Sequence, residues 1–242
     1  MHIARSTPRA TNYSYSFLTI LVIGSLLAIA LRGYFITAAI VFQPLDDARS
    51  SIDAAEYYRR AWNMLHHGVL SIDIPSQAAP AASSFRDPGY PLFLALWLAV
   101  ATDYQNWYAA VLVAQAVLGG VTVACVVIAF RHEIPTWALA KVALLAAAWP
   151  HSVTIASCIL SENLTAPLVA GSLLALRRSV ESPTRSRALL AGLMLACAGL
   201  TNAVLAPMTI VLALVLHKKR YMTLGPLAVL SLAALLPLMT WG

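Results

Sequence analysis

The sequence predicts an all-α, polytopic membrane protein with about seven transmembrane helices and interfacial helices in its first outer loop. Two features of the composition predict this fold class, because 60 % of the 242 residues are hydrophobic and only 11 % are charged, whereas soluble domains carry about 25 % charged residues. The third is that basic residues stand as short flanks to apolar runs, which is the pattern that membrane topology produces. The net charge of +6 therefore predicts no nucleic-acid partner.

The first segment of the chain is expected to cross the membrane once. Residues 1–15 predict a cytoplasmic tail, and residues 16–42 predict the first transmembrane helix. The apolar stretch there is longer than that of a signal peptide and close to the ~20 residues that span a bilayer. Arg32, in the outer half of this helix, either snorkels to the interface or faces a polar interior.

Residues 43–106 predict an outer loop. The stretch from Pro44 to Tyr90 is the only long polar segment of the chain and holds six of its ten acidic residues. Apolar side chains recur at spacings of three and four over residues 50–68, which predicts an amphipathic helix with its aromatic face on the membrane interface. Pro91 to Val100 is about half the length of a span, so a short helix is expected to lie in the outer leaflet or dip into it.

Residues 107–242 are expected to supply the remaining transmembrane helices, so that residues 1–242 form a single module. The thirty-residue run from Ala188 to His217 is too long for one helix and is interrupted near Asn202 and Pro207, which predicts a hairpin of two short helices. An irregular, more polar stretch follows Trp149. The other predicted helices lie within residues 107–130, 136–149, 163–176 and 222–239.

Charge supports this layout. With the N-terminus in the cytoplasm and seven crossings, every later basic cluster falls inside, as the positive-inside rule requires of short loops. Of the acidic residues, only Glu133 and Glu181 fall inside, while Asp103 and Glu162 join the six of the loop outside. The inner basic residues are Arg131, Arg177, Arg178, Arg185, Arg187, Lys218, Lys219 and Arg220.

Three acidic residues of the outer loop are candidates for catalysis. Asp53 stands near the start of the predicted helix, where it is either an N-cap or a catalytic carboxylate. Asp46 and Asp47 are adjacent, and they either lie in a solvated loop or bind a divalent cation, which prefers oxygen ligands. The three cysteines fall singly in apolar segments, so no zinc site or disulfide framework is predicted.

Other polar residues are candidates for substrate binding. Arg86 begins a rigid turn that contains two prolines and a glycine, and there it either binds phosphate or pairs with Asp87 or a lipid headgroup. Glu162 is an ionisable group at membrane depth, which is a functional candidate by default, with a capping carboxylate as its alternative. His151 could act as a ligand or a base.

Several motifs, taken together, resemble those of a known superfamily. They are D-x-x-x-Y-Y-x-x-A-x-x-x-L-x-x-G from Asp53, R-x-P-G-Y-P-L-F-L-A from Arg86, a QAVLGG-bearing helix, WP followed by SEN-L, and an AGLT segment. Their order is similar to that in polytopic glycosyltransferases of the GT-C superfamily, among them protein O-mannosyltransferases and the lipid A aminoarabinose transferase. The resemblance runs from about residue 15 to the end, and its most specific part is RDPGYPLFLAL with the upstream Asp–Tyr–Tyr helix.

The resemblance implies a glycosyltransferase, or the amino-terminal module of one, at the outer face of a bacterial inner membrane. Such enzymes transfer a sugar from a polyprenyl-phosphate donor to an acceptor hydroxyl. Asp53 matches the general base, with Asp47 and Asp46 as alternatives. Glu162, Arg86 and the tyrosines of the two motifs, Tyr57 and Tyr90, match substrate-binding positions, and His151 joins them in the WP segment.

Two departures from the pattern bear on this expectation. Asn202-Ala203 stands where members often carry Arg-Pro after the AGLT segment. Members are usually longer, so the chain is expected to be the amino-terminal module, with a partner chain supplying the second half. The alternatives are a non-catalytic accessory subunit that binds lipid-linked sugar or a partner chain, and a small transporter. Dependence on a divalent cation stays open.

Overall fold

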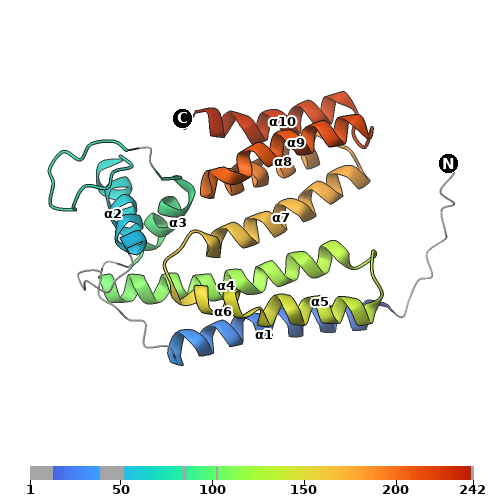
Figure 1. The fold of residues 1–242 in the computed structure, drawn as a ribbon, viewed down its shortest axis with the longest axis horizontal. Coiled ribbons are helices and arrows are strands. Elements are labelled where there is room, and N and C mark those ends of the chain that lie inside the picture. Colours follow the sequence, from blue (N-terminus) through green and yellow to red (C-terminus); the bar gives the residue numbers. More distant parts are fainter. Residues whose placement is uncertain (1–12, 39–51, 84–85, 102, 241–242) are drawn as a thin grey trace.

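The computed structural model describes residues 13–38, 52–83, 86–101 and 103–240. Within these ranges the chain is helical and contains no β-strand, which confirms the all-α prediction. Seven helices lie roughly side by side in a bundle (Figure 1). They are α1 (Tyr13–Ala38), α4 (Tyr104–Phe130), α5 (Thr136–Ala148), α7 (Glu162–Glu181), α8 (Arg185–Thr201), α9 (Ala206–Lys218) and α10 (Leu224–Met239).

The helices follow one another across the bundle. α1 packs on α4 and α5, α4 packs on α7, α7 on α8, α8 on α10, and α10 on α9. Two further helices, α2 (Ile52–His67) and α3 (Gly89–Leu98), lie at one end, where α3 contacts α4 and α8 (Figure 1). We call this the acidic end; the α5–α7 and α8–α9 connections also lie there. The turns α4–α5, α7–α8 and α9–α10 form the opposite, basic end.

Local chemistry sets the helix limits. Asp103 is the N-cap of α4 and accepts a hydrogen bond from the Asn106 backbone N–H at 3.0 Å, which satisfies one of the free donors of the first turn. α5 ends before Trp149-Pro150, because a proline has no N–H to continue the helical ladder. The chain resumes at an angle of 46° as α6 (Pro150–Thr154) and the short η1 (Ile155–Ser157), in the stretch predicted to be irregular.

The break in the Ala188–His217 run also lies where it is predicted. α8 ends at Thr201, the one-turn η2 (Ala203–Leu205) follows, and α9 begins at Ala206 with Pro207 in its first turn. The Asn202 side chain accepts a hydrogen bond from the Val204 N–H at 3.2 Å. Proline is tolerated in a first turn, because its missing donor would have no partner there.

Fewer helices than predicted are long and apolar enough to cross a membrane. Among the described residues only α1, from Tyr15, and α4 meet this standard, and the bent pair of α5 with α6 and η1 makes a third if it counts as one span. The predicted number was about seven. The first helix also ends at Ala38 within the described residues, and the predicted extension over 39–42 lies outside them. α9 and α10 are apolar but shorter.

The aromatic face of α2 packs against protein. Tyr57 and Ala61 are buried in one cluster with Tyr90 and Leu94 of α3 and Trp107 of α4. This face was expected to rest on the membrane interface. Instead it anchors α2 to the acidic end of the bundle, and Gly68, with a φ of 66°, ends the helix in the left-handed conformation that glycine adopts without strain.

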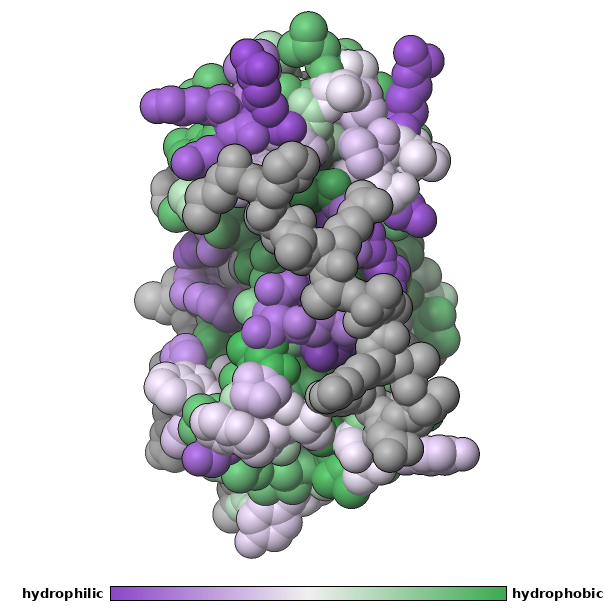
Figure 2. Space-filling view, turned by 90° about the vertical axis from the view of Figure 1, so that its right-hand side faces the viewer, coloured by the Kyte–Doolittle hydropathy of each residue, from purple (hydrophilic) through white to green (hydrophobic). Residues whose placement is uncertain are grey.

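The two ends of the bundle differ in charge. The eight basic residues listed above as the inner cluster all lie near helix ends or in the connecting turns at the basic end. Figure 2 looks onto this end and shows hydrophilic side chains gathered over its upper and central part. Both acids at this end pair with one arginine, since Arg177 contacts Glu133 and Glu181 at 2.7 Å each. The basic end therefore has a strong net positive charge.

Candidate functional site

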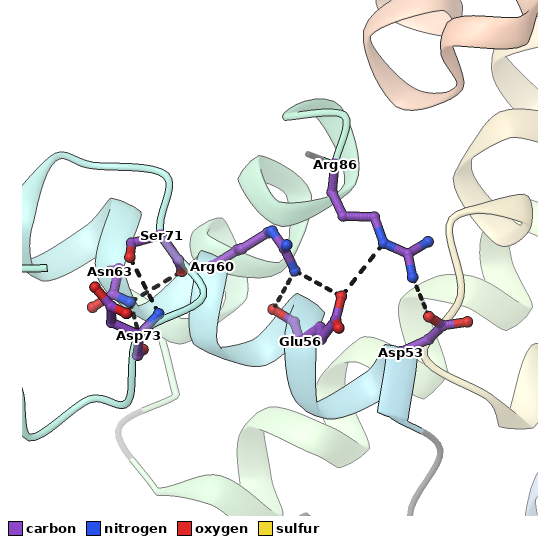
Figure 3. Close-up of polar contacts among 7 residues, drawn as sticks. All are labelled: Asp53, Glu56, Arg60, Asn63, Ser71, Asp73 and Arg86. Atoms are coloured by element: carbon purple, nitrogen blue, oxygen red, sulfur yellow. Dashed lines mark hydrogen bonds and ion pairs between the residues drawn. The ribbon is translucent and has the colours of Figure 1, made fainter. Parts of the chain in front are cut away.

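Arg86 holds two carboxylates of α2 together at the acidic end. Its Nη2 forms an ion pair with Asp53, and its Nε lies 3.4 Å from Glu56 Oε2 (Figure 3). Asp53 and Glu56 are three residues apart, so both project from one face of the helix. Burial alone would lower the pKa of Arg86, but the charges of Asp53 and Glu56 outweigh it and the pKa is raised. Arg86 is therefore a permanent cation between two acids.

Arg60 extends this network into the protein. Its side chain is fully buried, with 0 % exposure, and its Nη1 donates to Glu56 Oε2 at 3.1 Å. The Nε and Nη2 atoms of Arg60 have no hydrogen-bond partner among the described residues. Glu56 thus serves two arginines, one buried and one near the surface (Figure 3).

The network continues through aromatic side chains to α4. The Arg86 guanidinium lies 5.6 Å from the centre of the Tyr57 ring, and Tyr57 meets Tyr90 edge to face with ring centres 4.9 Å apart. The Tyr90 hydroxyl donates to Gln115 Oε1 at 2.6 Å. Burial, Tyr57 and the charge of Glu162 all raise the pKa of Tyr90 well above its usual value, so this phenol stays neutral and remains a donor.

Gln115 fixes the connection between α6 and α7. Its Nε2 donates to the carbonyls of Ala156 and Cys158 at 3.0 and 3.1 Å. Asn163 supports the same turn and donates to the Cys158 carbonyl at 3.1 Å. A buried amide with all these partners is favourable, because each free carbonyl would otherwise cost about 1–3 kcal/mol. The bonds hold the start of α7, and hence Glu162, in place.

A pocket of about 690 Å³ lies next to this turn, between α4, α5, α6 and α7. Gln115 lines it, as do the predicted residues Glu162 and His151. The remaining lining is mostly apolar and includes Leu145 and Leu173. Arg32 of α1 adds a cation to the lining.

The structure brings the predicted site residues together, as far as it describes them. Asp53, Arg86, Tyr57 and Tyr90 form one contiguous cluster, and Glu162 and His151 line the adjoining pocket. Asp53 lies one residue inside the start of α2, so it is in the first turn rather than at the N-cap. Arg86 pairs with Asp53 and Glu56 rather than with Asp87.

Two predicted residues are not placed. Asp46 and Asp47 lie outside the described residues, and with them the proposed divalent-cation pair. Among the residues that the structure describes, no group of three His, Cys, Asp or Glu side chains is arranged to hold a metal ion.

Asp87 has a different partner from the one considered in the sequence. Its Oδ2 accepts a hydrogen bond from the Ala203 N–H at 2.9 Å. This bond connects the turn that begins at Arg86 to η2. Ala203 occupies the position where the resemblance expects proline. A proline has no N–H, so this departure from the pattern is what permits the contact.

Sequence reasoning missed the roles of two residues. Glu56 was counted only among the acids of the loop, although its spacing of three from Asp53 and four from Arg60 could have shown a shared face. Gln115 was noted only as part of a motif.

Comparisons of this chain with protein-family models, with curated proteins and with solved structures find no match.

Proposed function

We propose that this chain is a membrane glycosyltransferase of the GT-C type, or the amino-terminal module of one. One observation carries the proposal: the predicted acidic base and its arginine are linked, through Tyr57, Tyr90 and Gln115, to a pocket lined by the two other predicted polar residues. A half-exposed carboxylate next to a cation and an amphiphilic pocket suits a reaction between a surface acceptor and a lipid-linked donor.

The proposed reaction is an inverting transfer from a polyprenyl-phosphate sugar. Asp53, whose side chain is 44 % exposed, takes the proton of the acceptor hydroxyl. The hydroxyl oxygen attacks the anomeric carbon, and the bond from that carbon to the phosphate oxygen breaks, so that polyprenyl phosphate leaves with the electron pair. Arg86 stabilises the leaving phosphate, which draws it away from Asp53 and frees the carboxylate to act as base.

The proposed setting is a bacterial inner membrane, with seven crossings and the acidic end outside. The separation of charge between the two ends supports it, because the positive-inside rule places basic short loops in the cytoplasm. Segment 43–106 would then be periplasmic or extracellular, in contact with lipid headgroups and the cell envelope.

An accessory subunit without catalysis is the second candidate. The ion pairs of Arg86 favour it, because Asp53 and Glu56 already neutralise the cation in this structure. A subunit of this kind would bind lipid-linked sugar or a partner chain and leave the chemistry to another protein.

The test uses full-length protein in nanodiscs with a radiolabelled polyprenyl-phosphate sugar. Transfer of label to an acceptor is expected for the wild type, and Asp53→Asn should abolish it. Asp103→Asn is the matched control, because Asp103 lies at the same end, is exposed and caps α4, and asparagine caps a helix as well as aspartate. Transfer that survives Asp53→Asn but requires Asp47 would move the base. Donor binding without any transfer would favour the accessory subunit.

A further inference from the structure

The proposed chemistry leaves one buried cation unused. Arg32, in the outer half of α1, is only 5 % exposed. Its Nη1 donates to the carbonyls of Ala28 and Ala147 at 3.0 and 3.1 Å, where Ala147 lies at the end of α5, so part of the guanidinium caps that broken helix. Among the described residues it forms no ion pair. A buried charge without a counter-ion is costly, and proteins normally pair it or use it.

The fold makes room for this side chain. A Cβ on Gly119 of α4 would lie 2.7 Å from Arg32 Cζ and still closer to its Nε and Cδ. A side chain larger than that of glycine at this position would therefore displace the guanidinium. Gly119 belongs to the QAVLGG motif, four residues and about one helical turn beyond Gln115, so one motif supplies both the Tyr90 acceptor and the space for Arg32.

Arg32 faces the pocket, and so does Gly119. Both hydrogen bonds that Arg32 forms among the described residues come from Nη1, which leaves Nε and Nη2 for a ligand. The rest of the wall is mostly apolar, and two of its leucines, Leu145 of α5 and Leu173 of α7, are 62 % and 44 % exposed. The pocket thus combines one buried cation with an apolar opening between two helices, and its volume suits a small ligand.

We propose that Arg32 is the anion-binding residue of this pocket and that its ligand is the phosphate group of a membrane lipid. The guanidinium would bind two phosphate oxygens in its planar fork, and the lipid chain would leave between Leu145 and Leu173. Glu162 lines the same pocket at its outer end, so the phosphate lies at the inner part, toward Gly119. A free phosphate would leave the apolar wall uncovered, and the chain of a lipid would cover it.

This inference goes beyond the proposed function, in which Arg86 and not Arg32 stabilises the leaving phosphate of the donor, and its test needs no sugar transfer. Native mass spectrometry of the full-length protein in dodecyl maltoside would count bound palmitoyl lysophosphatidic acid. Monopalmitoylglycerol, which lacks only the phosphate, and inorganic phosphate are the matched probes. One lysophosphatidic acid should bind. Monopalmitoylglycerol should bind at least about tenfold more weakly, since losing a charge-assisted hydrogen-bonded pair costs more than about 1.4 kcal/mol. Inorganic phosphate should also bind at least about tenfold more weakly, since it has no apolar chain to bury.

Variants place the binding site. Arg32→Gln keeps a donor for the Ala147 carbonyl and should weaken the binding of lysophosphatidic acid at least about tenfold. Arg32→Lys should retain part of the affinity. Gly119→Ala should also weaken it, and since alanine favours a helix over glycine, that variant tests the site even where Arg32→Gln fails to fold. The double variant Lys218→Gln/Lys219→Gln removes charge at the basic end and should leave binding unchanged.

Three outcomes would overturn the inference. Equal binding of monopalmitoylglycerol would show that the pocket recognises only the chain, and saturation by inorganic phosphate alone would show a free-anion site. Loss of binding in the Lys218→Gln/Lys219→Gln variant instead of Arg32→Gln would move the lipid to the basic end. Lipid binding that persists without any sugar transfer would leave this inference standing and count against the proposed function alone.

Discussion

Glu56 is the residue whose loss should disturb the acidic end most. It is the only carboxylate paired with the fully buried Arg60 among the described residues, and it also contacts Arg86. Removing one partner of a buried ion pair leaves an uncompensated charge. We predict that Glu56→Gln lowers the free energy of unfolding by about 3 kcal/mol, measured by chemical denaturation in detergent and followed by tryptophan fluorescence.

A second variant, at Arg60, distinguishes the cost of an unpaired buried charge from the cost of a lost hydrogen bond. Arg60→Met keeps an unbranched chain of similar reach and removes the buried cation, so the double variant Glu56→Gln/Arg60→Met should be more stable than Glu56→Gln alone. Replacing a buried pair by apolar side chains is often neutral or stabilising. Additive losses in the two single variants would contradict the prediction, because residues in one ion pair are expected to couple.

At the scale of elements, the contact between α3 and α8 depends on Gly89. A Cβ there would lie 2.5 Å from Thr201 Oγ1 and 2.9 Å from the backbone carbonyl of Leu200. Backbone atoms of a packed helix cannot move aside cheaply. We predict that Gly89→Ala lowers stability by about 1–3 kcal/mol, the usual cost of overpacking, and that the melting temperature in detergent falls accordingly.

Gly225 offers the matched control for that substitution. It lies in the first turn of α10, and a Cβ there would meet no atom within 4 Å. Alanine is the better helix former by up to about 1 kcal/mol, so Gly225→Ala should be neutral or stabilising. Equal effects of the two substitutions would show that the close approach of α3 to α8 contributes nothing.

The elements were largely predictable from the sequence, and their partners were not. Helix limits follow from local signals, such as Asp103 at the start of α4 and Trp149-Pro150 at the end of α5. The ion pair of Arg86 with Asp53 joins residues 33 apart, and the bond from Arg32 to Ala147 joins residues 115 apart. Such contacts depend on how the helices pack, which no single segment encodes.

In the candidate site too, the residues were predictable from the sequence and their partners were not. The motifs identified Asp53, Arg86, Tyr57 and Tyr90, and packing brought all four together. The spacing could not show that Arg86 pairs with Asp53 rather than with its neighbour Asp87, because Asp53 lies 33 residues away and the partner of Asp87, the Ala203 N–H, lies 116 residues away.

At the scale of the whole molecule, helix length and charge distribution lead to different expectations for the number of membrane crossings. α5 and α9 have 13 residues each and α10 has 16, so at about 1.5 Å per residue they are about 20–24 Å long, short of the ~30 Å hydrocarbon core. The connections nevertheless alternate between the two ends (Figure 1). Short crossings are tolerated by local thinning and by basic side chains that snorkel, at modest cost.

Labelling from outside the cell decides between these indications. In a variant whose three cysteines are replaced by serine, Ser76→Cys places a thiol on the exposed α2–α3 connection, and Ser186→Cys places one in the first turn of α8 at the basic end. Both are exposed serines, so the two variants are matched. A membrane-impermeant maleimide should label Ser76→Cys in intact bacterial cells and Ser186→Cys only after permeabilisation. Labelling of both in intact cells, or the reverse order, would contradict the proposed topology, because the basic end could then not be the cytoplasmic one.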